Sequence, residues 1–175
     1  PYLLVMQHPV TTEYGDGEAQ ITATLKAIQE LHMPTVMMWP NADAGAEDIA
    51  RGMRKFREHN EHDYIRFYKN LPLDVFIPLM MHTACMIGNS SAAVREGSFL
   101  GTPAVNIGTR QTGRDHADNV INAGYDTGEN VAAIKQHLEH GRFDPHPLYG
   151  EGNSGKRLAD VLATCSLDVQ KRITY

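Results

Sequence analysis

The chain alternates short apolar runs with longer amphipathic segments along most of its length. Short, continuous apolar runs are typical of buried strands, and the longer segments repeat their apolar residues at helical spacing. Strands and helices that alternate in this way are typical of βαβ units built around a parallel sheet. We therefore predict an α/β fold with a doubly wound, Rossmann-like parallel sheet.

The predicted strands cover residues 2–6, 35–39, 64–67, 86–87, 104–107 and, on a weaker pattern, 119–121. The predicted helices cover 18–31, 46–58, 73–82, 92–100 and 129–140, and a last helix over 155–164 closes the pattern. Right-handed crossovers then give the strand order 3-2-1-4-5-6, with ligands bound at the carboxyl ends of the strands. The segments that directly follow strands should meet at that edge, and they contain His8, Asn41, residues 89–91 and residues 108–114.

A strand-to-helix turn in the middle of the chain predicts an anion site. Small polar residues at 88–91 lead into the helix predicted over 92–100, whose first N–H groups and positive dipole end face outward. Glu96 lies about one and a half turns further along, where a carboxylate can accept ribose hydroxyls. Arg110 and Arg114 follow the next strand, and the whole arrangement suits a nucleoside diphosphate. The alternative is that the Asn and Ser residues are ordinary N-caps.

Composition narrows the class of protein. A length of 175 residues suits one domain with a single core. A net charge of −5 and a pI near 6.0 argue against a general nucleic-acid binder. Cys85 and Cys165 make no disulfide framework, and no apolar run approaches the ~20 residues of a membrane span. We expect a cytoplasmic protein with no nucleic-acid or membrane partner.

Four motifs occur in a recognisable order along the chain. They are Gln7-His-Pro-Val-Thr-Thr, Pro40-Asn-Ala-Asp-Ala-Gly, Gly88-Asn-Ser-Ser with Arg95-Glu96, and Gly101-Thr-Pro with Gly108-Thr-Arg-Gln-Thr-Gly-Arg. Together they resemble the C-terminal half of UDP-N-acetylglucosamine 2-epimerases, over residues 8 to about 162. The last motif is more similar to the hydrolysing branch, which serves the synthesis of sialic acid and related nonulosonates.

The resemblance implies one half of a two-domain GT-B-type fold, with residues 1–175 as the UDP-binding C-terminal domain. The chain opens at Pro1 and enters a predicted strand almost at once, which favours a piece cut from a longer protein. Most of the acid and base carboxylates of this family would then belong to the N-terminal domain. The intact enzyme is expected to be a homo-oligomer, most simply a dimer.

The resemblance also assigns contacts with the UDP-sugar. His8 would contact the pyrophosphate and assist the departure of UDP, although a His in such a loop is more often structural. Asn41 would contact the nucleotide, or else make only an Asx-turn, and a backbone group near Leu71 would read the uracil. Glu96 would hold the ribose. The phosphates would be held by Ser90, Ser91, Arg110 and Arg114.

The implied reaction needs no redox cofactor, and no metal ligand set is expected. UDP-N-acetylglucosamine would lose its C2 proton while the anomeric C–O bond breaks, giving UDP and a 2-acetamidoglucal. Water would then add to give N-acetylmannosamine. Two alternatives stay open: a non-hydrolysing epimerase, and the nucleotide half of a GT-B glycosyltransferase or a non-catalytic UDP-binding module.

Overall fold

A six-stranded parallel sheet forms the centre of the computed structural model, which describes residues 1–166. Its strands are β1 (Leu3–Met6), β2 (Thr35–Met38), β3 (Ile65–Tyr68), β4 (Cys85–Gly88), β5 (Ala104–Ile107) and β6 (Val120–Ala123). They lie in the order β3-β2-β1-β4-β5-β6, and every neighbouring pair is parallel. The α/β class, the doubly wound sheet and the predicted strand order are therefore confirmed.

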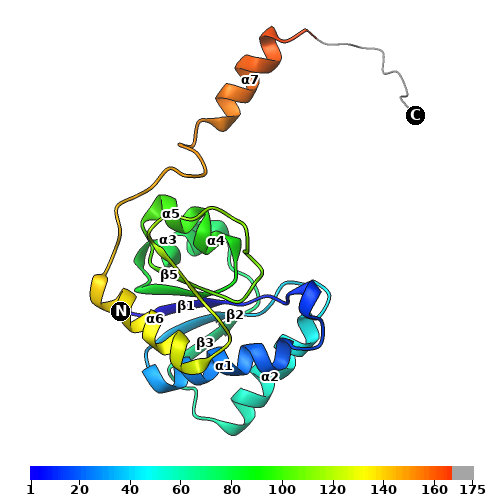
Figure 1. Ribbon diagram of the computed structural model, residues 1–175, viewed down its shortest axis with the longest axis vertical. Coiled ribbons are helices and arrows are strands. Elements are labelled where there is room, and N and C mark those ends of the chain that lie inside the picture. The colour runs from blue at the N-terminus through cyan, green and yellow to red at the C-terminus, as the bar shows by residue number, and fades with distance from the viewer. Residues whose placement is uncertain (167–175) are drawn as a thin grey trace, which may run out of the picture.

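Helices cover both faces of the sheet. They are η1 (Thr11–Glu13), α1 (Gly17–Leu31), α2 (Ala46–His59), α3 (Leu73–His82), α4 (Ser91–Val94), α5 (Glu96–Leu100), α6 (Thr127–His140) and α7 (Ser154–Thr164). Helices α1, α2 and α6 lie against one face, and α3, α4 and α5 lie against the other (Figure 1). Within residues 1–166, no helix is long and apolar enough to cross a membrane.

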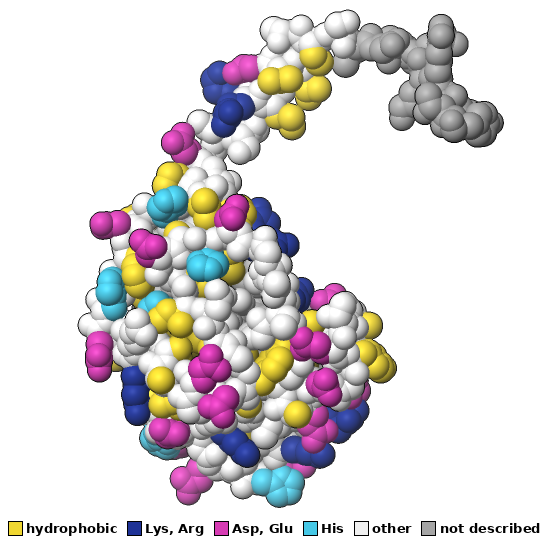
Figure 2. Space-filling view, in the orientation of Figure 1, with side chains coloured by type: hydrophobic (Ala, Val, Ile, Leu, Met, Phe, Trp, Pro, Cys, Tyr) yellow, Lys and Arg dark blue, Asp and Glu magenta, His cyan; other side chains and the backbone are white. Residues whose placement is uncertain are grey.

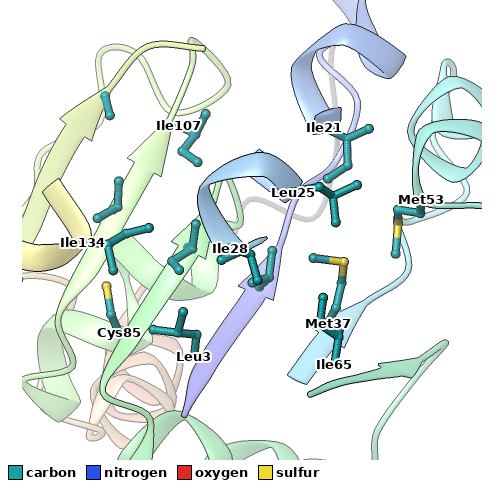
Figure 3. Close-up of a cluster of buried hydrophobic side chains, with 14 of the residues drawn as sticks. Leu3, Ile21, Leu25, Ile28, Met37, Met53, Ile65, Cys85, Ile107 and Ile134 are labelled. Carbon is teal, nitrogen blue, oxygen red and sulfur yellow. The ribbon is translucent and has the colours of Figure 1, made fainter. Parts of the chain in front are cut away.

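The core consists of one apolar layer on each side of the sheet. Leu3 and Val5 of β1 point into the layer under α1, α2 and α6, part of which is drawn in Figure 3. Leu4, between them, points into the layer under α3 and α4. Successive side chains of a strand point to opposite faces of the sheet. Because both faces are buried here, residues on both sides of the strand must be apolar, and apolar and polar residues do not alternate. This is why β1 reads as a continuous apolar run.

The helix predicted over 92–100 is wrong as a single element, because it breaks at Arg95. Arg95 is the C-cap of α4 and the N-cap of α5, with a φ of −89° and a ψ of −70°. Its carbonyl accepts both the Phe99 N–H at 3.5 Å and the Ser98 hydroxyl at 2.9 Å. The result is α4, of four residues, followed directly by α5.

Helix α7 forms close to its predicted bounds but does not cover the sheet. It projects from the α/β body, and the segment before it is exposed as well (Figure 1). Its apolar residues lie along the protruding segment in Figure 2, where Leu158, Val161 and Leu162 are 63, 59 and 57% exposed. The expectation that this helix closes the α/β pattern is therefore wrong for the described part of the chain.

Candidate functional site

The ends of β1 and β4 are joined by one buried side chain. The Asn89 Oδ1 atom accepts the His8 N–H at 2.7 Å, and Asn89 Nδ2 donates to the His8 carbonyl at 2.8 Å. Gly88 makes this approach possible, because its φ is +123° and a Cβ there would lie 2.2 Å from the Met6 carbonyl oxygen. The two strand ends are thereby held in a fixed relationship.

Asn89 also anchors the loop that follows β5. Its carbonyl accepts from Gln111 Nε2 at 2.7 Å and from Arg110 Nη1 at 3.2 Å. The side chain of Asn89 is fully buried and both of its polar atoms bind His8. The side-chain amide of Asn89 is therefore used within the protein, and the anion seat expected at residues 88–91 stays a prediction.

His8 is buried where β1 and β4 end, and the backbone N–H of Asn41 fixes the orientation of its ring. It is only 3% exposed, and its Nδ1 atom accepts the Asn41 N–H at 3.1 Å. Burial, followed by the positive charge of Arg110, lowers the pKa of His8 to about 4, and Asp43 opposes part of that shift. The imidazole is therefore neutral near pH 7, and because Nδ1 is the acceptor, the ring proton resides on Nε2.

Arg110 and Asp43 form an ion pair across the mouth of the site. Arg110 Nη2 lies 3.6 Å from Asp43 Oδ2, and both side chains remain partly exposed. They line a cleft of about 430 Å³ whose other walls come from Pro9, Val10, Thr11, Thr12 and Thr109. The cleft thus combines a cation, a carboxylate and hydroxyl groups directly beside His8, as expected of a site for a charged, polar ligand.

Ser90 and Ser91 lie at the start of α4. Ser90 is the N-cap of α4, and its hydroxyl accepts the Ala92 N–H at 3.3 Å. Helix α4 has four residues, and the nearby Arg110 adds a full positive charge at this edge. The phosphate contacts of Ser90 and Ser91 stay predictions.

Glu96 and Leu71 lie away from the cluster around His8. Glu96 is exposed and lines a separate, largely apolar cavity of about 350 Å³, together with Arg95, Phe99 and Tyr149. Leu71 follows β3, and its N–H is bound by the Asn70 side chain at 2.9 Å. These observations leave the ribose and uracil contacts as predictions.

Asn41 and Arg114 are both exposed. The backbone of Asn41 contacts His8, as described above. Arg114 ends the turn that its N–H closes onto the Gln111 carbonyl at 3.1 Å. The structure thus brings together His8, the Asn41 backbone and Arg110, whereas Arg114 lies further out on the same loop.

Glu13 is a polar centre that sequence reasoning missed. Its carboxylate accepts hydrogen bonds from Thr109, Tyr125 and Gln20. The signal available in the sequence was its position, because Glu13 follows His8 by one short turn and lies in the segment already expected at the site.

A sequence model of the family described as UDP-N-acetylglucosamine 2-epimerase matches residues 1–163. The UDP-N-acetylglucosamine 2-epimerase of Neisseria meningitidis serogroup B is 30% identical over 177 residues, which cover 98% of this chain and 46% of that protein. The UDP-N,N'-diacetylbacillosamine 2-epimerase (hydrolyzing) of Legionella pneumophila is 26% identical over 167 residues, which cover 95% of this chain and 44% of that protein. The crystal structure of the Neisseria meningitidis UDP-GlcNAc 2-epimerase bound to UDP-GlcNAc has a TM-score of 0.70 at 15% identity. The match covers 94% of this chain and 45% of that one.

The chain spans about half the length of the curated relatives it matches. That share is the one expected for one half of a two-domain GT-B-type fold, and the superposition onto solved epimerases agrees with it. The four sequence motifs, the doubly wound sheet and the match over residues 1–163 lead to the same assignment: the chain belongs to the UDP-N-acetylglucosamine 2-epimerase family.

Proposed function

We propose that this chain is the UDP-binding half of a hydrolysing UDP-N-acetylglucosamine 2-epimerase. The observation that carries the proposal is the cluster of His8, Asp43 and Arg110 at the carboxyl edge of the sheet, in a chain that belongs to this family. Ligands of open α/β sheets bind at that edge. The pyrophosphate of the UDP-sugar would occupy the cleft beside Arg110.

The fixed tautomer of His8 defines its role in this proposal. A neutral imidazole with its proton on Nε2 donates a hydrogen bond, and its lowered pKa makes an imidazolium rare near pH 7. His8 therefore acts as a hydrogen-bond donor to the departing UDP and not as a cationic acid. A donor already held in place stabilises the charge that develops on the leaving group without reorganising during the reaction.

Arg110 supplies the positive charge for the same step. Its guanidinium is held by the Asn89 carbonyl and pairs with Asp43. A phosphate oxygen would replace Asp43 as the main partner of Arg110, because guanidinium binds phosphate in a charge-assisted, often bidentate manner. Asp43 would then face the sugar side of the cleft.

The remaining contacts complete the proposed complex. Ser90 and Ser91 would bind phosphate oxygens, and Glu96 would accept the ribose hydroxyls. Arg114, on the exposed part of the loop after β5, would bind the phosphates. A backbone group near Leu71 would contact the uracil, and Asn41 would contact the nucleotide.

The proposed reaction follows the hydrolysing branch. A base removes the C2 proton of UDP-N-acetylglucosamine while the anomeric C–O bond breaks, and the products of this step are UDP and a 2-acetamidoglucal. Water then adds to the glucal and gives N-acetylmannosamine. Support for this branch comes from the motif over 108–114 and from the similarity to a relative named as hydrolyzing. The base would be supplied by the other half of the enzyme, which we also propose to be dimeric.

Product analysis on an enzyme that contains this chain tests the proposal. Incubation with UDP-N-acetylglucosamine should yield free N-acetylmannosamine and UDP in equal amounts. Accumulation of UDP-N-acetylmannosamine would instead assign the chain to a non-hydrolysing epimerase. If the sugar appeared only on an added acceptor, the chain would be the nucleotide half of a glycosyltransferase.

A further inference from the structure

The carboxylate of Glu13 joins three separate segments of the chain. It accepts a hydrogen bond from the Tyr125 hydroxyl at 2.6 Å, another from Gln20 Nε2 at 2.6 Å, and a third from the Thr109 hydroxyl. Gln20 lies in α1, Thr109 in the loop after β5, and Tyr125 in the loop after β6. A single side chain therefore connects the segment after β1 to both neighbouring loops.

The positions of Glu13 and Thr109 relate this contact to the site. Glu13 ends η1, which follows His8 after one short turn, and Thr109 directly precedes Arg110. The hydrogen bond between them holds the loop that carries Arg110 against the loop that carries His8. Residues of both loops line the cleft of about 430 Å³.

Tyr125 supports the same loop from its other side. Gly108, the first residue of the loop, has a φ of +76°, and a Cβ there would come within 2.1 Å of the Tyr125 hydroxyl oxygen. The tyrosine ring therefore lies directly over the backbone at Gly108 and reaches Glu13 beyond it. The beginning of the loop is held between Tyr125 and Glu13.

The charge states of these groups keep the contacts in place near neutral pH. Hydrogen bonds from Thr109, Tyr125 and Gln20 lower the pKa of Glu13, so its carboxylate stays ionised and accepts all three. Burial and the neighbouring Glu13 raise the pKa of Tyr125 to about 12, so its hydroxyl remains a donor.

We propose that Glu13 is a positioning residue, which sets the location of Arg110 for the phosphates of a nucleoside diphosphate bound in the cleft. This inference rests on the proposed function, because it requires that Arg110 binds phosphate. Glu13 is not among the residues that line the cleft, so it would act on the ligand only through Arg110. The Gln111 to Asn89 hydrogen bond also anchors the loop, so the loss of Glu13 should displace Arg110 without unfolding the protein.

The experiment compares the binding of UDP and uridine by titration calorimetry in wild type and five variants. Glu13→Gln keeps the size of the side chain, Thr109→Val removes the hydroxyl next to Arg110, and Tyr125→Phe removes the hydroxyl over Gly108. Glu30→Gln is the matched control, because it removes the same charge from an exposed position on α1. The fifth variant, Glu13→Gln/Thr109→Val, measures the coupling between the two residues.

The inference predicts that Glu13→Gln weakens UDP binding about five- to tenfold and leaves uridine binding within about twofold. Removal of a negative charge near Arg110 would by itself strengthen the binding of an anion, so weaker binding identifies positioning and not bulk electrostatics. Thr109→Val should resemble Glu13→Gln, and the double variant should be no weaker than either one alone. Tyr125→Phe should have a smaller effect in the same direction, and Glu30→Gln should bind like wild type.

Several results would overturn the inference. They are an unchanged affinity of Glu13→Gln for UDP, a tighter affinity, an equal loss of UDP and uridine binding, or additive effects of the two substitutions. Failure of the wild-type chain to bind UDP would overturn the proposed function and this inference together. Normal UDP binding by wild type with any of the first four results would overturn only the role of Glu13.

Discussion

The side chain of Asn89 binds both backbone polar groups of His8, so that the ends of β1 and β4 act as one rigid unit. The Asn89 carbonyl adds Arg110 and Gln111 to the same unit. His8 and Arg110 therefore share an anchor, although they are far apart in the sequence. The geometry of the proposed phosphate site depends on this shared anchor.

Replacement of Asn89 by Ala should destabilise the protein by about 2–4 kcal/mol, because it leaves two buried backbone groups of His8 without partners. Urea denaturation monitored by circular dichroism measures the change. Asn153→Ala is the control, because Asn153 is exposed and its side chain makes no cap hydrogen bond, and it should change stability by less than about 0.5 kcal/mol. Similar losses in the two variants would show that the His8 contacts contribute little.

Protonation of His8 should make stability depend on pH. The pKa of His8 is lowered from 6.5 to about 4 in the folded protein, so between these values the unfolded chain binds a proton that the folded chain does not. The contribution of His8 is fully present above pH 6.5 and is lost as the pH falls toward 4, by up to about 3 kcal/mol. Urea denaturation at several pH values should show a shallower fall for His8→Gln than for wild type. Parallel curves would contradict the lowered pKa.

Arg110 and Glu96 should affect different parts of the nucleotide. Arg110→Ala should weaken UDP binding about ten- to a hundredfold and leave uridine binding nearly unchanged, because it removes a charge-assisted phosphate contact. Glu96→Ala should weaken UDP and uridine alike, because the ribose is common to both. Titration calorimetry measures all four affinities, with Arg66→Ala as a control at an exposed position on β3. Equal effects of the two substitutions on both ligands would refute these roles.

The 175-residue chain should bind UDP-N-acetylglucosamine without releasing UDP, because we expect the base for the C2 proton to lie in the other half of the enzyme. A coupled assay for UDP release tests this directly. In an active enzyme that contains the chain, His8→Ala should lower kcat more than it raises KM, because the His8 contact strengthens as UDP departs. Turnover by the chain alone would move the search for the base to its own carboxylates, beginning with Asp43.

Much of the fold could be predicted because its determinants are local. Continuous apolar runs marked the strands, crossover handedness gave their order, and the ends of parallel strands had to meet at one edge. His8 and Arg110 were placed in the same site by this reasoning alone. The sequence pattern also located the turn between β4 and α4.

The remaining features depend on contacts that a sequence does not reveal. The predicted helix divides at Arg95 through a local change of backbone conformation, which the spacing of apolar residues does not show. The amide of Asn89 suits an N-cap as well as the clamp on His8 that it forms. Glu13 meets Thr109 and Tyr125 across 96 and 112 residues of chain, and such pairs become visible only once the strands are placed.

The most direct test of the account is a titration of the isotopically labelled chain with UDP, followed by NMR chemical-shift mapping, with AMP and NAD as competitors. The account predicts that UDP binds more tightly than AMP or NAD, with the largest shifts at His8, residues 88–96 and residues 108–114. The absence of a preference for UDP, or shifts centred away from the carboxyl edge of the sheet, would contradict it.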